Sequence, residues 1–230
     1  MAKSNRPSGL SLPRPVGTRL NPKVRSAAER AAKRSFDVVL ALVLLAFLIP
    51  LLVALSAVIS ASDGGPALFR QRRVGRQGKP FTCLKFRTMR CDAEKALNDL
   101  LEADTEAARE WTENQKLSCD PRITPLGQFL RRTSLDELPQ LLNILSGEMS
   151  FVGPRPIVEA EIARYGEAFS QCFSVPPGLT GLWQVSGRSD CGYVTRVALD
   201  ARYARDWTLA LDLQILVQTV PAVLSGRGSR

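Results

Sequence analysis

The sequence contains no histidine among its 230 residues. Histidine is the usual general base at neutral pH and the commonest zinc ligand, so its absence leaves carboxylates to carry any proton transfer or nucleophilic attack. Cysteine is scarce as well: the five cysteines are odd in number and widely spaced, with no C-x-x-C pair. This pattern gives no sign of a metal or redox pair and predicts reduced thiols of the cytosolic type.

Acidic residues are outnumbered, 22 against 31 Lys and Arg, which gives a net charge of +9. Such a balance favours anionic partners, either phosphates, acidic lipid headgroups or nucleic acid. No nucleic-acid motif, internal repeat or coiled-coil register is present, so a nucleic-acid partner is not expected. Residues 1–24 are basic, rich in proline and poor in apolar side chains, a composition typical of a disordered tail.

One long apolar segment, Phe36 to Ala61, consists almost entirely of aliphatic residues around a central Pro50. A straight helix of this length would reach roughly 39 Å at about 1.5 Å per residue, enough to cross a hydrocarbon core of about 30 Å. The segment starts far from Met1 and has no small-residue cleavage pattern, which argues against a signal peptide.

Basic residues flank this segment on both sides. Because positive charge favours the cytoplasmic side, both flanks are predicted to lie there. A re-entrant helical hairpin with its turn at Pro50 satisfies this condition, since proline kinks a helix. An ordinary kinked span and a buried core helix remain as alternatives.

The rest of the chain predicts an α+β fold, mainly helical, with a short β element. We expect a basic tail (1–34), a re-entrant membrane helical hairpin (35–62), a cytosolic catalytic domain (63–225) and a short tail (226–230). Within the domain, Phe81 to Arg87 alternates as in a strand or hairpin. Helices are predicted over Asp92–Lys116, Pro125–Arg132, Leu135–Leu145, Ile157–Phe173 and Val194–Arg205, and an extended stretch over Pro177–Gly187. The last element, Trp207–Leu224, is predicted to be amphipathic. It either lies in the membrane interface or packs on the core.

The densest polar cluster runs from Arg131 to Gln140, where Asp136 and Glu137 follow two arginines at a helix start. Adjacent helical residues diverge by roughly 100°, so the two acids can grip different parts of one ligand. One carboxylate could attack phosphorus while the other holds a divalent cation, and Arg131 could neutralise phosphate charge. The alternative is a capping box, in which Glu137 merely bonds back to Ser134.

Further cationic candidates lie in turns and in the predicted strand. Glycine- and proline-rich turns deliver Arg155 and Arg188, which suit bidentate phosphate binding or are simply surface arginines. Lys85 and Arg87 are candidates for substrate binding, with anchoring to lipid headgroups as their alternative role.

Several ordered motifs together resemble the bacterial sugar transferases, the monotopic polyprenol-phosphate phosphoglycosyl transferases that start exopolysaccharide and glycoconjugate assembly. They are Phe36-Asp37, Lys85-Phe86-Arg87-Thr88-Met89, Asp120-Pro121-Arg122-Ile123-Thr124, Leu130 to Gln140, Gly153-Pro154-Arg155-Pro156 and Pro177-Gly178-Leu179-Thr180-Gly181. The resemblance covers about residues 34–225 and is to the compact form, since residues 1–35 contain no additional spanning segment. One departure is Ile49, where the family often has a small polar residue before the proline.

The resemblance implies a re-entrant membrane helix broken at Pro50, an Asp136–Glu137 dyad, Mg²⁺ dependence and phosphate handling by Arg131, Arg155 and Arg188. It implies transfer of a hexose-1-phosphate from a UDP-sugar to undecaprenyl (polyprenol) phosphate with release of UMP. Asp136 would form a covalent phosphosugar intermediate and Glu137 would hold the metal. The expected location is the bacterial inner membrane, in contact with its lipids, with the catalytic domain on the cytoplasmic face.

Two rival hypotheses remain at this point. In the first, transfer is direct within a ternary complex and Asp136 is a metal ligand only. In the second, the chain is a membrane-anchored basic binding module without catalysis. The second leaves the paired acids unexplained, because they would repel an anionic ligand unless a metal intervened.

Overall fold

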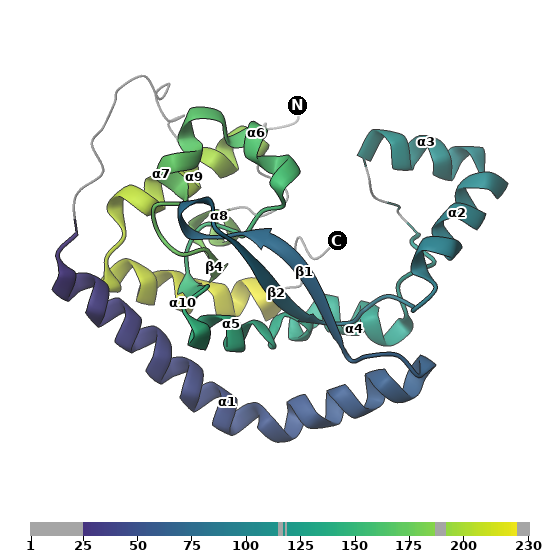
Figure 1. The fold of residues 1–230 in the computed structure, drawn as a ribbon, viewed down its shortest axis with the longest axis horizontal. Coiled ribbons are helices and arrows are strands. Elements are labelled where there is room, and N and C mark those ends of the chain that lie inside the picture. The colour runs from purple at the N-terminus through teal and green to yellow at the C-terminus, as the bar shows by residue number, and fades with distance from the viewer. Residues whose placement is uncertain (1–24, 115–116, 118, 187–191, 225–230) are drawn as a thin grey trace, which may run out of the picture.

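The computed structural model describes residues 25–114, 117, 119–186 and 192–224; the predicted N-terminal and C-terminal tails lie largely outside this range. The described chain is mainly helical, with two small two-stranded sheets (Figure 1). The prediction of a mainly helical α+β fold with a short β element is confirmed.

The longest element is α1 (Ala27–Asp63), the one helix in the described chain that is long and apolar enough to cross a membrane. It begins with a capping box between Ser26 and Glu29 and ends at Gly64, whose φ of 72° lies in the left-handed region. Pro50 lies inside the helix without ending it. Figure 1 shows α1 as an arc whose two ends point toward the rest of the protein.

Both ends of α1 pack against the domain, while much of its apolar surface stays exposed. Ala41 is fully buried in the main hydrophobic cluster, and Ile59 is buried in a second cluster with Phe86 and Leu130. Between them Phe47 is 81% exposed and is accompanied by further exposed aliphatic side chains. The helix therefore presents one apolar face to the protein and one away from it.

A β-hairpin follows α1, formed by β1 (Leu68–Val74) and β2 (Pro80–Phe86). The 3₁₀ turn η1 (Arg76–Gly78) joins the strands, with Gln77 and Gly78 both at positive φ. The antiparallel register places Phe69 opposite Lys85, Gln71 opposite Cys83 and Arg73 opposite Phe81. These six residues share one face of the hairpin, because side chains alternate along each strand. The predicted β element is confirmed.

The segment predicted as one helix from Asp92 to Lys116 forms two, α2 (Ala93–Ala103) and α3 (Thr105–Asn114). The break falls at Asp104, which has an extended backbone and whose carboxylate accepts bonds from the amides of Glu106 and Ala107. A residue that offers the backbone such bonds favours a helix start over a helix interior. The two helices project from the body of the protein (Figure 1).

The helix α4 (Pro125–Thr133) begins as predicted, with Thr124 accepting a bond from the Gly127 amide and Pro125 in the first turn. It is followed by the short 3₁₀ turn η2 (Leu135–Glu137) and by α5 (Gln140–Ser146), which ends at the left-handed Gly147. The predicted helix ending near Gly147 is thus confirmed, although its regular part begins only after Pro139.

A parallel pair of three-residue strands, β3 (Ser150–Val152) and β4 (Gly178–Thr180), was not predicted. Gly153 and Gly178 allow the two backbones to approach, since a Cβ on either would collide with the other strand's backbone. The predicted helix Ile157–Phe173 is wrong as a single element, because Gly166 at φ 51° divides it. Its pieces are η3 (Glu159–Glu161), α6 (Ile162–Tyr165), η4 (Gly166–Ala168) and α7 (Phe169–Cys172).

The C-terminal part contains α8 (Leu182–Val185), α9 (Tyr193–Asp206) and α10 (Leu209–Leu224). The first of these is a helical turn inside the stretch predicted to be extended. The helix α9 agrees with its prediction, and α10 continues through Pro221. Ile215 of α10 is fully buried in the main cluster, whereas Leu213 and Val217 are exposed, so this helix both packs on the core and presents an apolar face.

A buried polar network ties the start of α1 to α10. Lys33 Nζ lies 2.5 Å from Asp212 Oδ2 and 3.2 Å from the carbonyl oxygen of Val152 in β3. The Tyr203 hydroxyl lies 2.7 Å from Asp212 Oδ1. Asp37 adds a further link by accepting a bond from the Phe151 amide at 3.1 Å.

Asp212→Asn should therefore destabilise the protein by about 3–5 kcal/mol, the usual cost of removing one partner of a buried ion pair. The exposed pair Arg205–Asp206 supplies the control, because Asp206→Asn should change stability by less than about 1 kcal/mol. Thermal unfolding of both variants in the same detergent measures the difference. Equal effects would show that the Lys33–Asp212 pair does not fasten α1 to the domain.

Candidate active site

The Asp136–Glu137 pair lies in the 3₁₀ turn η2, between α4 and α5. The preceding Ser134 has φ 58° and ψ 16°, a left-handed conformation uncommon for a residue with a side chain. Its side chain makes no capping bond to this turn, so the capping box considered from the sequence is not formed. Such backbone strain persists where the surrounding structure requires it, often at functional sites.

Glu137 is held in its ionised form by a cation on β2. Lys85 Nζ lies 2.6 Å from Glu137 Oε1, and both side chains are only about one-fifth exposed. Burial alone would raise the pKa of Glu137, but the charges of Lys85 and Arg155 outweigh it and the pKa is lowered. Gln140 donates a further side-chain hydrogen bond to this carboxylate. Glu137 is therefore an anion at neutral pH.

Asp136 has the opposite electrostatic character. It is buried, and burial together with the neighbouring charge of Glu137 raises its pKa to about 6. Lys85 and Arg131 oppose this shift. The carboxylate is thus ionised at neutral pH and poorly solvated, a state suited to nucleophilic attack.

Arg131, on the last turn of α4, lies within electrostatic reach of Asp136. Its Nε donates to Thr88 Oγ1 at 2.9 Å. Burial lowers the pKa of Arg131, and the negative charges of Asp136 and Asp120 oppose that shift. The structure therefore places the guanidinium of Arg131 close enough to Asp136 for their charges to interact.

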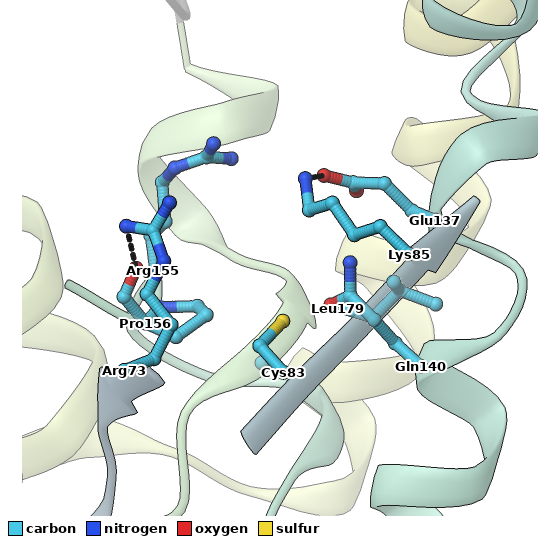
Figure 2. A pocket seen from close by; sticks show the side chains of 9 residues that line it. Arg73, Cys83, Lys85, Glu137, Gln140, Arg155, Pro156 and Leu179 are labelled. Atoms are coloured by element: carbon cyan, nitrogen blue, oxygen red, sulfur yellow. Dashed lines mark hydrogen bonds and ion pairs between the residues drawn. The ribbon is translucent and has the colours of Figure 1, made fainter. Parts of the chain in front are cut away.

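A cleft next to Glu137 is drawn in Figure 2. Its lining residues are Arg73, Cys83, Lys85, Glu137, Gln140, Arg155, Pro156, Gly178 and Leu179. Arg73 and Arg155 form one wall, the Lys85–Glu137 ion pair forms the other, and Cys83 lies between them. The cleft thus combines cationic groups with one carboxylate, as the binding of a metal-complexed diphosphate requires.

Two further predicted site residues lie outside the cleft, and a third is not among the described residues. Arg87 makes an ion pair with Asp63 and donates to the carbonyl oxygen of Ile59 at 3.1 Å, so it anchors the end of α1. Pro50 lies within α1, and Arg188 falls outside the described residues. Substrate binding by Arg87 and Arg188 stays a prediction.

The sequence analysis missed Arg73, Cys83 and Gln140 as cleft residues. From sequence, Arg73 is one of the basic residues that follow the apolar segment, and nothing in its motif assigns it to a site. The strand alternation could have identified it, because Arg73 lies two residues from Gln71 and faces the same side as Cys83 and Lys85 once the hairpin register is known.

The donor set in the described residues is compatible with magnesium. No cluster of three or more acidic or cysteine side chains is found there, which argues against an all-protein metal cage. Magnesium usually binds through one or two carboxylates and completes its shell with waters and substrate phosphates. Glu137 supplies one such carboxylate, ionised and beside the cleft.

Comparison with known proteins places these features in a family. The family model described as "Bacterial sugar transferase" matches residues 28–226. The exopolysaccharide production protein ExoY of Rhizobium meliloti is 50% identical over 86% of this chain and 88% of its own length.

Longer relatives match over a smaller share of their length. The undecaprenyl-phosphate galactose phosphotransferase of Salmonella typhimurium is 46% identical over 92% of this chain but only 44% of its own. The UDP-glucose:undecaprenyl-phosphate glucose-1-phosphate transferase of Escherichia coli is 38% identical over 85% of this chain and 40% of its own. With the carboxylate pair, the cationic cleft and the matched length taken together, this chain belongs to the bacterial sugar transferase family.

Proposed function

We propose that this protein transfers a hexose-1-phosphate from a UDP-sugar to undecaprenyl phosphate, releases UMP and so initiates exopolysaccharide synthesis. The observation that carries the proposal is the dyad geometry, in which a buried, ionisable Asp136 adjoins a Glu137 that Lys85 keeps charged. The relatives' names supply the substrate classes, a UDP-sugar donor and an undecaprenyl-phosphate acceptor.

The reaction proceeds in two steps. In the first, an Asp136 carboxylate oxygen bonds to the sugar-bearing phosphorus, and the bond from that phosphorus to the bridging oxygen breaks. The electron pair stays on that oxygen, which leaves as part of the UMP phosphate. In the second step the acceptor phosphate attacks the same phosphorus and regenerates the carboxylate. Both nucleophiles are already anions, so neither step needs the histidine that the chain lacks.

The surrounding residues stabilise charge and exclude water. Arg131, beside Asp136, offsets negative charge on the transferred phosphoryl group. Glu137 would hold Mg²⁺, which would neutralise part of the donor's diphosphate charge. The burial of Asp136 keeps water from solvating the nucleophile.

The test is a two-stage assay with the purified protein. With a UDP-sugar and magnesium alone, up to one UMP per active site should be released and a phosphosugar should stay on the protein. Addition of undecaprenyl phosphate should then discharge it to the lipid and give ping-pong kinetics. Strict dependence of UMP release on the acceptor, with no adduct on Asp136, would replace this mechanism by direct transfer. Binding of these compounds with no turnover would support the binding-module hypothesis.

The structure also supports a re-entrant arrangement of α1 on the cytoplasmic face. Arg34 near one end donates to carbonyl oxygens of α5, while Arg87 binds Ile59 and Asp63 at the other end. Both ends of α1 thus contact the same domain. If α1 crossed the bilayer, its two ends would lie on opposite sides of the membrane and could not both contact a domain on one side. The arc between them has an exposed apolar face, which under this proposal contacts lipid.

Topology reporters placed at Ala28 and Gly78 should therefore both report the cytoplasm, since basic residues flank α1 on each side. Pro50→Leu should straighten the helix and move part of the population to a spanning orientation, because the clearest cause of a bend is then removed. Labelling of single-cysteine variants at the two sites in intact cells measures this. Periplasmic labelling of either site in the unaltered helix would contradict the re-entrant arrangement.

A further inference from the structure

The cleft contains a pair of like charges that the dyad does not account for, Arg73 on β1 and Arg155 after β3. Figure 2 shows the two guanidinium groups on the same wall. Burial and the positive charge of Arg155 both lower the pKa of Arg73, so the two groups are close enough to repel each other. Such a pair is expected where an anion binds between or beside the two groups.

The groups that hold Arg73 in place are mostly neutral. Its Nε and Nη2 donate to Gln71 Oε1 at 3.1 and 2.6 Å, and Nη1 donates to the Pro156 carbonyl oxygen at 3.4 Å. The nearest carboxylate, Glu161, lies at 3.9 Å and also pairs with Arg196 at 3.5 Å. Within the described part of the chain these hydrogen bonds use three of the five N–H donors of the guanidinium, and its ion-pair partner Glu161 is shared with Arg196.

The position of the pair indicates which part of a donor it would meet. Figure 2 shows Arg73 and Arg155 on one side of the cleft and Lys85 with Glu137 on the other. On this face of the hairpin, Phe69 lies opposite Lys85. Arg73 lies four residues further along β1 than Phe69, a distance of about 13 Å at about 3.3 Å per residue. The arginine pair thus lies across the cleft from the ion pair of Lys85 with Glu137, the residue next to Asp136 in η2.

We infer that Arg73 and Arg155 bind the phosphate of the leaving nucleoside monophosphate. The inference rests on the proposed function, in which Asp136 bonds to the sugar-bearing phosphorus. That placement leaves the nucleoside-bearing phosphate on the far side of the broken bond, toward the arginines. As the phosphorus–oxygen bond breaks, the bridging oxygen takes the electron pair and the departing phosphate gains a negative charge. Two guanidinium groups fixed beside this oxygen stabilise that charge as it develops.

The β1 strand offers a matched control in Arg72, the neighbouring arginine. Arg72 is exposed and lies opposite Thr82 on the other face of the hairpin. Arg73→Gln and Arg72→Gln therefore make the same change of charge one residue apart, and only the first removes a guanidinium from the cleft.

Equilibrium binding of UMP to the full-length protein in detergent with magnesium tests the inference without requiring turnover. Arg73→Gln should weaken UMP binding by about tenfold or more, the loss expected for a charge-assisted hydrogen bond. Arg72→Gln should bind UMP within about twofold of the unaltered protein, since an exposed distant charge is screened. Arg73→Lys, which keeps the charge but loses the planar fork, should also bind UMP more weakly. If Arg73→Gln fails to fold, Arg73→Lys carries the same comparison.

Two outcomes would overturn the inference: unchanged UMP binding in the folded Arg73 variants, or equal weakening by Arg72→Gln, which would indicate only bulk charge. Its failure is distinguishable from failure of the covalent mechanism. A protein that forms no phosphosugar adduct but loses UMP affinity on Arg73→Gln keeps this inference and loses the mechanism. If the protein shows a normal UMP burst and the Arg73 variants bind UMP with unaltered affinity, the covalent mechanism stands and this inference fails.

Discussion

Asp136→Asn should abolish both the acceptor-independent release of UMP and the attachment of a phosphosugar to the protein, and it should make the folded chain more stable at neutral pH. The loss of chemistry follows because an amide oxygen is a poor nucleophile toward phosphorus, while the carboxylate attacks without any base. No histidine or other activated group is available in the sequence to take its place.

The gain in stability follows from the raised pKa of Asp136. Burial and the charge of Glu137 raise that pKa from 3.8 to about 6, so the folded protein favours the protonated carboxyl more than the unfolded chain does. This contribution to stability is present in full below pH 3.8 and is lost as the pH rises through about 6. At neutral pH the ionised Asp136 costs on the order of 2–3 kcal/mol, which a neutral asparagine removes.

Thermal unfolding at two pH values separates this effect from a general one. The stabilisation by Asp136→Asn should be large at pH 7.5 and roughly half as large at pH 5, because at pH 5 the folded protein keeps the proton while the unfolded chain still loses it. The burst of UMP release by the unaltered protein should rise as pH increases through about 6. Asp92→Asn, at an exposed carboxylate paired with Arg90, is the control and should alter neither property. A destabilised Asp136→Asn variant would contradict the electrostatic account of this residue.

The carboxylate pair could be identified from sequence because its signal is local. Two adjacent acids follow two adjacent bases at a helix start, and the Pro139 that interrupts the helical pattern already indicates an irregular entry. The positive φ of Ser134 was not readable, since serine carries no preference for the left-handed region. That conformation is what separates α4 from the turn that holds Asp136 and Glu137.

Elements that depend on distant partners were less predictable. The parallel pairing of β3 with β4 joins residues 150–152 to 178–180, and strands of three residues are too short to show an alternating pattern. The start of α1 at Ala27 was likewise missed, because the polar residue Lys33 appeared to be part of a solvated flank. Its partner Asp212 lies far away in the sequence, so burial of the pair could not be foreseen.

The cleft shows the same division. Lys85 and Arg155 were candidates because their motifs are distinctive, whereas Arg73 needed the register of the hairpin to place it on their side. The sequence of one strand predicts which of its residues share a face. Only the pairing of β1 with β2 decides which of the two faces lines the cleft.

Glu137→Gln should lower turnover by on the order of 10²–10³, the usual effect of removing one electrostatic group from an active site. Glutamine keeps the shape of the side chain but not its charge. Lys85, 2.6 Å from the carboxylate in the native protein, would then add an unpaired cation to a cleft that already contains Arg73 and Arg155. The variant would also lose the anionic ligand that, under the proposed function, helps to hold magnesium.

Two measurements distinguish this role from a purely structural ion pair. The magnesium concentration needed for half-maximal turnover should rise in Glu137→Gln, which loss of a structural contact alone would not produce. Thermal stability should fall only modestly, because the glutamine can still accept a bond from Lys85 and interact with Gln140. Glu148→Gln is the matched control: this exposed carboxylate near the end of α5 binds Asn143 and Ser146, outside the cleft. Glu137→Gln could instead show near-normal turnover with a large loss of stability. That result would show that the ion pair with Lys85 fastens β2 to η2, and the assignment of Glu137 to the metal would have to be abandoned.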